Sequence, residues 1–244
     1  MRPWKILRRA VAGTANNMQI VPTITTITPA LWRGKLAEVK KFKLKEVCLF
    51  LTCLDLRQRK EFYSLFKETG VKTVPLAHIR SDMELWELDY LAETYKTKAF
   101  NTHTKREYAH LRDYGKYRKN IYIENGYEPF DEAEIKEFGG VCLDISHLES
   151  DRLLRPDSYG RIIEFLKRYP PQCSHVSAVK KKPFLDENGH QRHSLHTLAD
   201  LSEFDYLEKY PLEFFGEITA IELENTIEEQ LKAKEYISAL IKNK

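Results

Sequence analysis

The stretch NIYIENGYEPFDEAEIKEFGGVCLDISH, residues 120–147, places two short apolar runs on either side of a polar segment. The runs IYI and VCL have the length and β-branched character of buried strands, and FDEAEIKEFGG between them repeats apolar residues at helical spacing. A strand, a helix and a second strand in this order form a βαβ unit, whose two strands lie parallel in one sheet. The stretch therefore predicts an α/β protein with parallel strands.

The same alternation continues on both sides of this stretch. NIYIEN (120–125) and GVCLDISH (140–147) are two of eight strand-like runs. The other six are IVPTITTI (20–27), EVCLFLT (46–52), VKTVPLAHI (71–79), KAFNTHT (98–104), CSHVSAV (173–179) and EITAIELEN (217–225). Helical segments lie between them or close the chain: LRQRKEFYSLFKETG (56–70), MELWELDYLAETY (83–95), SYGRIIEFLKRYPP (158–171) and TIEEQLKAKEYISALIKNK (226–244). Gly70 ends the first of these and suits a helix C-cap.

Eight strands that alternate with helices predict a single (β/α)8 barrel, the TIM barrel. The 244 residues are an ordinary length for that fold. A doubly wound open sheet is the rival architecture, but it normally has fewer strands and a glycine-rich first turn. The first turn here, within ITTITPALWRG (24–34), contains no GxGxxG motif.

Composition and charge narrow the class of protein. Hydrophobic residues make up 42% of the chain, which is enough for a sizeable core. The 39 basic and 36 acidic residues nearly balance, which disfavours a dedicated nucleic-acid-binding protein. We expect residues 1–17, which are basic and lack acidic side chains, to form an N-terminal arm or helix, with a targeting peptide as the alternative. Residues 18–244 then form the barrel domain.

Cysteine spacing and hydropathy predict a cytoplasmic location. Cys48, Cys53, Cys142 and Cys173 do not have the spacing of a zinc ribbon or a CxxC motif, so we expect four reduced thiols. No apolar run approaches the ~20 residues that cross a bilayer, so no membrane partner is expected.

Metal-ligating residue types occur in six consecutive strand-like runs, at or near the end of most of them, whereas strand seven begins with His175. Active sites of (β/α)8 barrels lie at the C-terminal ends of the strands. The residues concerned are His78, His103, Glu124, Asp144 with His147, His175, and Glu222 with Glu224. Of the eight histidines, only His110 falls in a helical stretch. Whether Glu222 or Glu224 is the ligand from the eighth run stays open.

Buried carboxylates argue for a cation more strongly than the histidines do. A single histidine such as His78 is commonly a hydrogen-bonded core or surface residue. Glu124, Asp144 and Glu222 each follow an apolar run, where an unpaired charge is costly. Three carboxylates that converge on one barrel mouth repel one another, so we predict a divalent metal ion (Mn, Co, Mg or Zn) rather than a purely structural polar network.

A long connection separates the seventh and eighth runs. It includes KKKPFLDENGHQRHSLHTLADLSEF (180–204), and long polar loops on compact barrels are usually functional. Lys181 belongs to a charged cluster and could contact a phosphate. His190, His193 and His196 are candidates for further metal ligands or substrate contacts, or are ordinary loop residues.

The motifs IYIEN (121–125), VCLDISH (141–147) and AIELEN (220–225), with CSHVS (173–177), resemble the xylose isomerase-like barrel superfamily. This superfamily includes endonuclease IV and the sugar isomerases and epimerases of the tagatose-epimerase type. The resemblance covers roughly residues 46–240 and implies a mononuclear metal site of Glu124, Asp144, His175 and Glu222. It also implies that His147 contacts the substrate, and that Glu124 and Glu222 transfer a proton through an enediolate.

The nuclease branch of the superfamily uses more ligands. Histidines on strands three and four bind metal in that branch, and His78 and His103 fit this pattern. An Asp-x-His pair after strand seven completes a third metal position in the nucleases. Here Asp186 and His190 are too far apart, and RHSLH (192–196) has no aspartate before it.

Three functions follow as hypotheses. The first is a metal-dependent isomerase or epimerase of a sugar, a sugar phosphate or a related carbohydrate-like small molecule. The second is an endonuclease IV-like phosphodiesterase at abasic sites, in which case nucleic acid is the partner. The third is a barrel that binds a metal or ligand without catalysis. A homo-oligomer is possible under each of them.

Overall fold

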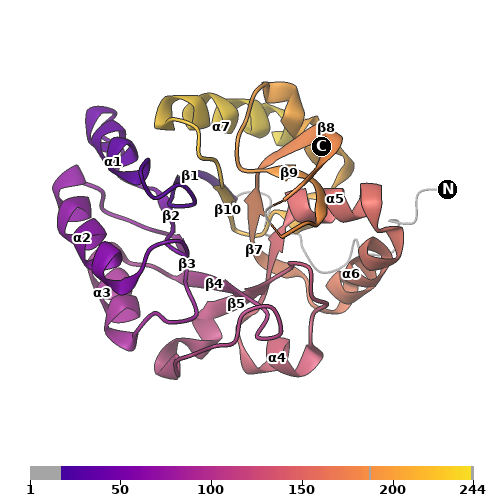
Figure 1. The fold of residues 1–244 in the computed structure, drawn as a ribbon, viewed down its shortest axis with the longest axis horizontal. Coiled ribbons are helices and arrows are strands. Elements are labelled where there is room, and N and C mark those ends of the chain that lie inside the picture. Colours follow the sequence, from indigo (N-terminus) through magenta and orange to yellow (C-terminus); the bar gives the residue numbers. More distant parts are fainter. Residues whose placement is uncertain (1–17, 187, 243–244) are drawn as a thin grey trace.

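Parallel strands form a closed barrel in a computed structural model that describes residues 18–186 and 188–242 (Figure 1). The order around the barrel is β1-β10-β7-β6-β5-β4-β3-β2, and each neighbouring pair is parallel. The strands are β1 (Gln19–Thr25), β2 (Cys48–Phe50), β3 (Leu76–His78), β4 (Ala99–His103), β5 (Ile121–Glu124), β6 (Gly140–Asp144), β7 (Pro171–Val176) and β10 (Ile218–Ile221). The predicted (β/α)8 barrel is confirmed. The arm or helix predicted for residues 1–17 lies outside the described residues.

Helices surround the barrel (Figure 1). They are α1 (Trp32–Lys41), α2 (Leu56–Phe66), α3 (Leu85–Tyr95), α4 (Glu132–Glu137), α5 (Ile145–Leu154), α6 (Pro156–Arg168) and α7 (Ile227–Lys242). Short 3-10 helices are η1 (Lys67–Thr69), η2 (Gly115–Asn120), η3 (Leu201–Lys209) and η4 (Leu212–Phe214). Between β4 and β5 the 3-10 helix η2 takes the place of a regular α-helix.

Local sequence explains how α2 begins and ends. The Asp55 side chain accepts a hydrogen bond from the Gln58 backbone at 2.8 Å, and the Gln58 side chain accepts one from the Asp55 backbone at 2.9 Å. This capping box satisfies two backbone donors of the first turn. The helix passes into η1 and ends at Gly70, whose φ of 83° is strained for other residues, as the sequence predicts.

Two clusters of buried side chains make up the core. A small one fills the barrel interior with one residue from each of seven strands: Val21, Cys48, Leu76, Ala99, Cys142, Cys173 and Ala220. A larger one packs the outer faces of the strands against the helices and includes Trp32, Phe62 and Phe204. Because the interior is packed with side chains, polar residues that point inward can meet only at the barrel mouth.

Four expectations about elements are corrected. The run GVCLDISH is not strand throughout: β6 ends at Asp144, and Ile145 begins α5. His175 does not begin its strand but lies near the end of β7. The long connection is not an irregular loop, because β8 (Ala178–Leu185) and β9 (Gln191–Leu195) form an antiparallel hairpin. His110 belongs to no helix, since the chain between β4 and η2 is irregular there.

Four cysteines lie within the described chain, and each is a free thiol. None of the helices in residues 18–186 and 188–242 is long and apolar enough to cross a membrane.

Candidate metal centre

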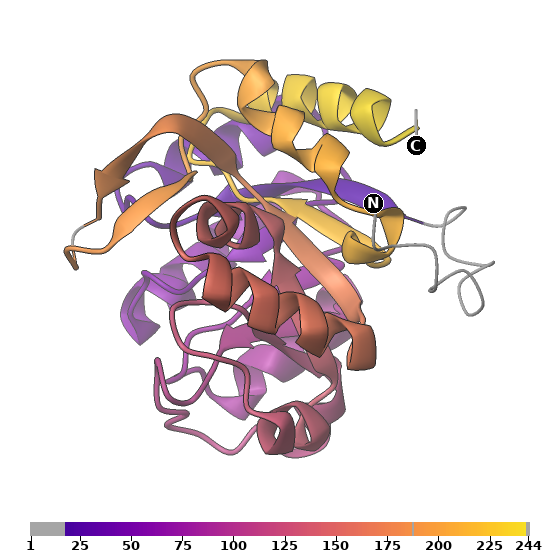
Figure 2. The same cartoon turned by 90° about the vertical axis from the view of Figure 1, so that its right-hand side faces the viewer.

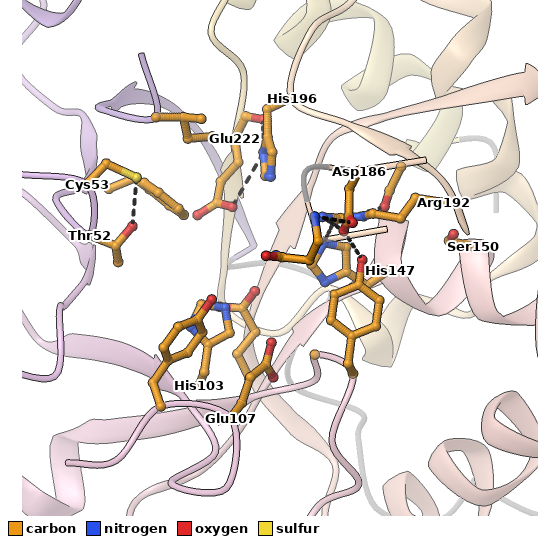
Figure 3. A pocket seen from close by; sticks show the side chains of 18 of the residues that line it. Thr52, Cys53, His103, Glu107, His147, Ser150, Asp186, Arg192, His196 and Glu222 are labelled. Atoms are coloured by element: carbon orange, nitrogen blue, oxygen red, sulfur yellow. Dashed lines mark hydrogen bonds and ion pairs between the residues drawn. The ribbon is translucent and has the colours of Figure 1, made fainter. Parts of the chain in front are cut away.

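The strand register brings the predicted ligands to one level of the barrel mouth. His103 pairs with Glu124 across β4 and β5, and Asp144 pairs with His175 across β6 and β7. Glu222 directly follows the last residue of β10. These side chains meet beneath a cavity of about 750 Å³ at the C-terminal ends of the strands, which Figure 3 shows from close by.

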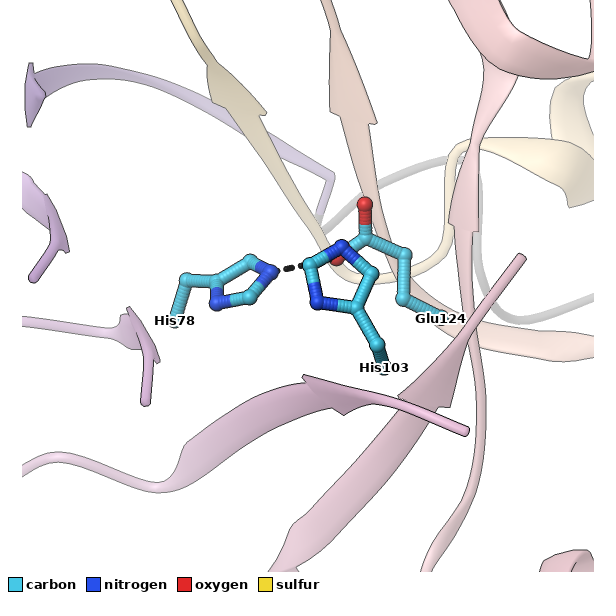
Figure 4. A group of neighbouring side chains, drawn as sticks. All are labelled: His78, His103 and Glu124. Carbon is cyan, nitrogen blue, oxygen red and sulfur yellow. Dashed lines mark ion pairs between the residues drawn. The ribbon is translucent and has the colours of Figure 1, made fainter. Parts of the chain in front are cut away.

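His78, His103 and Glu124 form the first donor set (Figure 4). One ligand atom of each lies within 4.8 Å of the others, and His78 Nε2 is 2.9 Å from Glu124 Oε2. Both His78 nitrogens are nevertheless buried without a hydrogen-bond partner. Burial lowers the pKa of His103 to about 3, which leaves that imidazole neutral, the form that binds metals.

Asp144, His175 and Glu222 form the second donor set. His175 Nδ1 lies 3.2 Å from Glu222 Oε1 and 3.3 Å from Glu124 Oε2. Its other nitrogen, Nε2, lies 3.6 Å from Cys142 Sγ within the barrel, which turns Nδ1 toward the mouth. Although burial alone would lower it, the charges of Glu222 and Glu124 raise the pKa of His175 to about 10. The pocket therefore attracts positive charge.

Glu124 belongs to the first set and lies beside the second, since it also groups with Cys142 and His175 and with Asp144 and His147. Asn101 Nδ2 donates a 2.6 Å hydrogen bond to Glu124 Oε2, the same oxygen that faces His78 and His175. Although burial opposes it, these two imidazoles hold the pKa of Glu124 well below its usual range. Glu124 is thus an ionised carboxylate at the junction of the two donor sets.

The donor atoms fit a divalent metal ion. Imidazole and carboxylate ligands together suit Mn, Co or Zn. Asp144 Oδ2, His175 Nδ1 and the His78 nitrogens are buried and make no hydrogen bond within the described chain, although buried polar atoms are normally paired. A cation would pair several of them at once, and the two sets provide two adjacent positions, with Glu124 in the first and 3.3 Å from His175 of the second.

Asp144 is oriented by the start of α5. Its Oδ1 caps that helix by accepting hydrogen bonds from the His147 backbone at 2.8 Å and from the Ser146 hydroxyl, which leaves Oδ2 for the mouth. Asn125 fixes Asp144 to the neighbouring strand, because its amide bonds the Asp144 N–H at 2.7 Å and the Asp144 carbonyl at 3.0 Å. The turn from β6 into α5 therefore fixes the direction of the Asp144 carboxylate.

His147 lines the cavity next to Asp144, as predicted for a substrate contact. Its Nε2 lies 3.6 Å from Asp144 Oδ2 and hydrogen-bonds the guanidinium of Arg192. Its Nδ1 lies 3.2 Å from the Asn125 carbonyl oxygen. Both ring nitrogens are thus engaged, and Arg192 occupies the position beside His147.

Glu222, not Glu224, is the donor from β10. Glu224 turns away and accepts hydrogen bonds from the Thr28 backbone at 2.6 Å and the Thr28 hydroxyl at 2.8 Å. Glu222 faces Glu124 and Asp144. Burial and the charges of these two carboxylates raise the pKa of Glu222 well above its usual range, although His175 opposes this rise.

The histidines of the long connection separate into two groups. His196 lines the cavity, with Nδ1 4.0 Å from Glu222 Oε2, and burial lowers its pKa to about 4. His193 points to the opposite face of β9, where Nδ1 bonds the Lys180 carbonyl at 2.6 Å. The structure therefore does not place His193 at the centre. Lys181 is exposed on β8 and does not line the cavity.

The β8–β9 hairpin projects from the barrel beside the mouth (Figure 2) and supplies Asp186 and Arg192 to the cavity lining. Tyr127, from the connection after β5, donates a 2.5 Å hydrogen bond from its hydroxyl to Asp186 Oδ2. The His190 ring stacks on Tyr127 with centroids 4.0 Å apart. Tyr127 thus ties the tip of the hairpin to the barrel.

Sequence reasoning missed Asn101, Glu107, Tyr127 and Arg192. Asn101 could have been found, because it lies two residues before His103 and strand alternation puts both side chains on one face. Glu107 and Tyr127 lie in connections, where no periodicity predicts direction, and Arg192 lies in β9, a strand that the sequence did not indicate.

Comparisons with known proteins give a likeness of fold only. No family model and no curated protein matches the chain. Among solved structures, an uncharacterized B. cereus protein is similar with a TM-score of 0.41 and 12% sequence identity. The match covers 90% of this chain and 65% of the B. cereus protein, so the chain spans less than two thirds of that length. A likeness at this level carries no argument about activity.

Proposed function

We propose that the barrel mouth binds two divalent metal ions and hydrolyses a phosphate ester. The position of Glu124 carries this proposal, because its carboxylate belongs both to the set with His78 and His103 and to the neighbourhood of His175. Pairs of metal ions that share a carboxylate are typical of phosphatases and nucleases.

Three guanidinium groups in the cavity lining support an anionic substrate once cations neutralise the carboxylates of the centre. Arg80, Arg155 and Arg192 line it, each from a different connection. Guanidinium groups match the geometry of phosphate oxygens. Arg192 is held in place by hydrogen bonds to His147 and, at 3.3 Å, to the Ser194 hydroxyl, so little rotamer freedom is lost when it binds an anion.

Each part of the site has a role in such a hydrolysis. When bound, the ions supply Lewis acidity at the phosphoryl oxygens and lower the pKa of the attacking water. Glu124 and Asp144 hold the ions, and Asn101 keeps the Glu124 carboxylate ionised and oriented. Arg192 orients the ester, and the hairpin limits access of bulk water.

We further propose membership of the xylose isomerase-like superfamily, on the side of the nucleases. The convergence of His78 and His103 on Glu124 supports this branch. The proposal is two ions rather than three, because Arg192 engages His147, and Asp186 bonds Tyr127. DNA with abasic sites is therefore one candidate substrate among phosphate esters.

A sugar isomerase or epimerase is the second candidate. It is supported by the contrast between two carboxyls, because the pKa of Glu222 is raised whereas that of Glu124 is lowered. Carboxyls whose pKa values are pushed apart suit an acid and base pair. Against it, Glu124 Oε2 already accepts from Asn101 and faces two imidazoles, which makes it a weak base.

Elemental mass spectrometry of the purified protein, combined with an activity panel, tests these candidates. We expect about two ions per chain in the wild type, about one in His103→Ala, and fewer than one in Glu124→Gln. His190→Ala, which changes an exposed histidine outside both donor sets, is the matched control and should keep the wild-type content.

Activity then separates the three functions. Turnover of phosphate esters, lost in His103→Ala, supports the proposal. One ion per chain with turnover of a sugar or sugar phosphate favours the isomerase. Bound metal without turnover of either class supports a binding protein, and absence of metal after zinc loading contradicts both enzymes.

A further inference from the structure

Glu107 is a carboxyl of the cavity that neither donor set uses. It lies in the connection after β4, lines the cavity, and points into it (Figure 3). It belongs to none of the metal-competent groups among the described residues. Its Oε2 is buried and makes no hydrogen bond within the described chain.

The backbone around Glu107 holds the carboxyl in place. The Glu107 N–H bonds the Thr104 carbonyl at 3.0 Å, which forms a tight turn directly after β4. On the other side the carboxyl rests against Gly126, where an added Cβ would overlap it. The glycine therefore creates the space in which this carboxyl lies, and the Tyr127 backbone donates to it.

The surroundings favour the protonated form of Glu107 near neutral pH. Burial and the charges of Glu124 and Glu128 raise its pKa to about 7, against the lowering effects of the Tyr127 backbone and Arg192. A carboxyl of this kind can donate a proton at the pH where most enzymes work.

We propose that Glu107 is the general acid of the hydrolysis, donating its proton to the leaving oxygen. This inference rests on the proposed phosphate ester hydrolysis. A water oxygen bonds to phosphorus while the bond from phosphorus to the leaving oxygen breaks, and the electron pair stays on that oxygen. The leaving oxygen takes the Glu107 proton and departs as an alcohol. The proton that the water releases passes to solvent, and solvent returns one to Glu107.

Leaving-group dependence tests this role, because only leaving groups of high pKa need the proton. In Glu107→Gln we expect kcat/KM to fall about 10²–10³-fold for an alkyl or phenyl phosphate ester. For the matching 2,4-dinitrophenyl ester, whose leaving group is stable as an anion, we expect less than about a threefold fall. Metal content should equal that of the wild type, since Glu107 is in neither donor set.

Two further variants make the test specific. Glu68→Gln removes an exposed carboxylate that does not line the cavity and should leave both esters unaffected. Gly126→Ala keeps Glu107 but displaces its carboxyl, and should slow the alkyl ester selectively and by a smaller factor.

Three results would overturn the assignment. An equal loss on both esters in Glu107→Gln would show that the residue acts on folding or substrate binding alone. Unchanged turnover of the alkyl ester would show that it has no role, while the proposed function would stand. Wild-type protein that hydrolyses no ester would overturn the proposed function and this inference together.

Discussion

Two glutamates at the centre, Glu124 and Glu222, are both buried within 3.3 Å of the same nitrogen of His175, yet their charges differ. Glu124 also receives a hydrogen bond from Asn101 and faces His78, so the ionised form is favoured. Glu222 is desolvated and faces other carboxylates, so the protonated form is favoured. The surroundings of each carboxyl, more than its chemical type, set its role.

His175 should make metal binding depend on pH. Its raised pKa of about 10 means that the metal-free protein carries the proton at pH 8, whereas a metal ligand must be neutral. Zinc binding at pH 8 should therefore release at least about one proton per chain, and affinity should rise with pH up to about 10. Calorimetry in buffers of different ionisation heat measures this release. His190→Gln should not change it, and heats independent of the buffer would contradict the expectation.

Four of the candidate ligands could be predicted from the residues that precede them in the sequence. Glu124, Asp144, His175 and Glu222 each follow an apolar run, and that local pattern places a charged group at the end of a buried strand. His193 was a wrong candidate, because the direction of its side chain depends on the hairpin, which the local sequence did not indicate.

At the scale of elements, much of the hairpin β8–β9 is exposed to solvent or only partly buried. Leu185, near its tip, is 68% exposed, and the tip is attached to the barrel through the Tyr127–Asp186 hydrogen bond. Elements with few buried contacts open locally more easily than barrel strands do.

Tyr127→Phe should loosen this hairpin. Removal of the hydroxyl leaves Asp186 without its 2.5 Å partner and should cost about 1 kcal/mol of local stability. Hydrogen exchange should accelerate roughly fivefold in β8 and β9 and stay unchanged in β5 and β6. Tyr236→Phe is the matched control, because it removes another tyrosine–aspartate hydrogen bond, to Asp205, away from the hairpin. Equal exchange in both variants would contradict the attachment.

The start of helix α5 could not be predicted from the apolar pattern of the sequence. The run VCLDISH is continuous in the sequence, yet Asp144 divides it, since its side chain caps the helix that starts at Ile145. An aspartate within an apolar run can equally continue a strand or cap a helix. The contact with Asn125, directly after β5, selects the second outcome.

At the scale of the whole molecule, closure of the barrel depends on the approach of β10 to β7. Gly216 precedes β10 with a φ of 63°, and a Cβ there would lie 2.5 Å from the Gln172 carbonyl oxygen. The Glu217 N–H bonds the same carbonyl at 3.0 Å, so this close approach starts the pairing.

Gly216→Ala should destabilise the fold by about 1–3 kcal/mol, because both the backbone angle and the contact become strained. Gly34→Ala is the matched control: Gly34 lies in α1 with open space around it, and alanine there should stabilise by about 0.5–1 kcal/mol. Urea unfolding of both variants measures the difference. A shift of the same sign in both would contradict the role of Gly216 in closure.

The sequence by itself determined the barrel and the level at which its ligands lie. Alternating apolar runs and helical segments depend on local periodicity, and the end of each run marks the barrel mouth. Only the tertiary structure decided which ligands share Glu124, that Arg192 reaches His147, and that Gly126 makes room for Glu107. These contacts join residues from different strands and connections, and their distances exist only once the barrel has closed and the hairpin has formed beside the mouth.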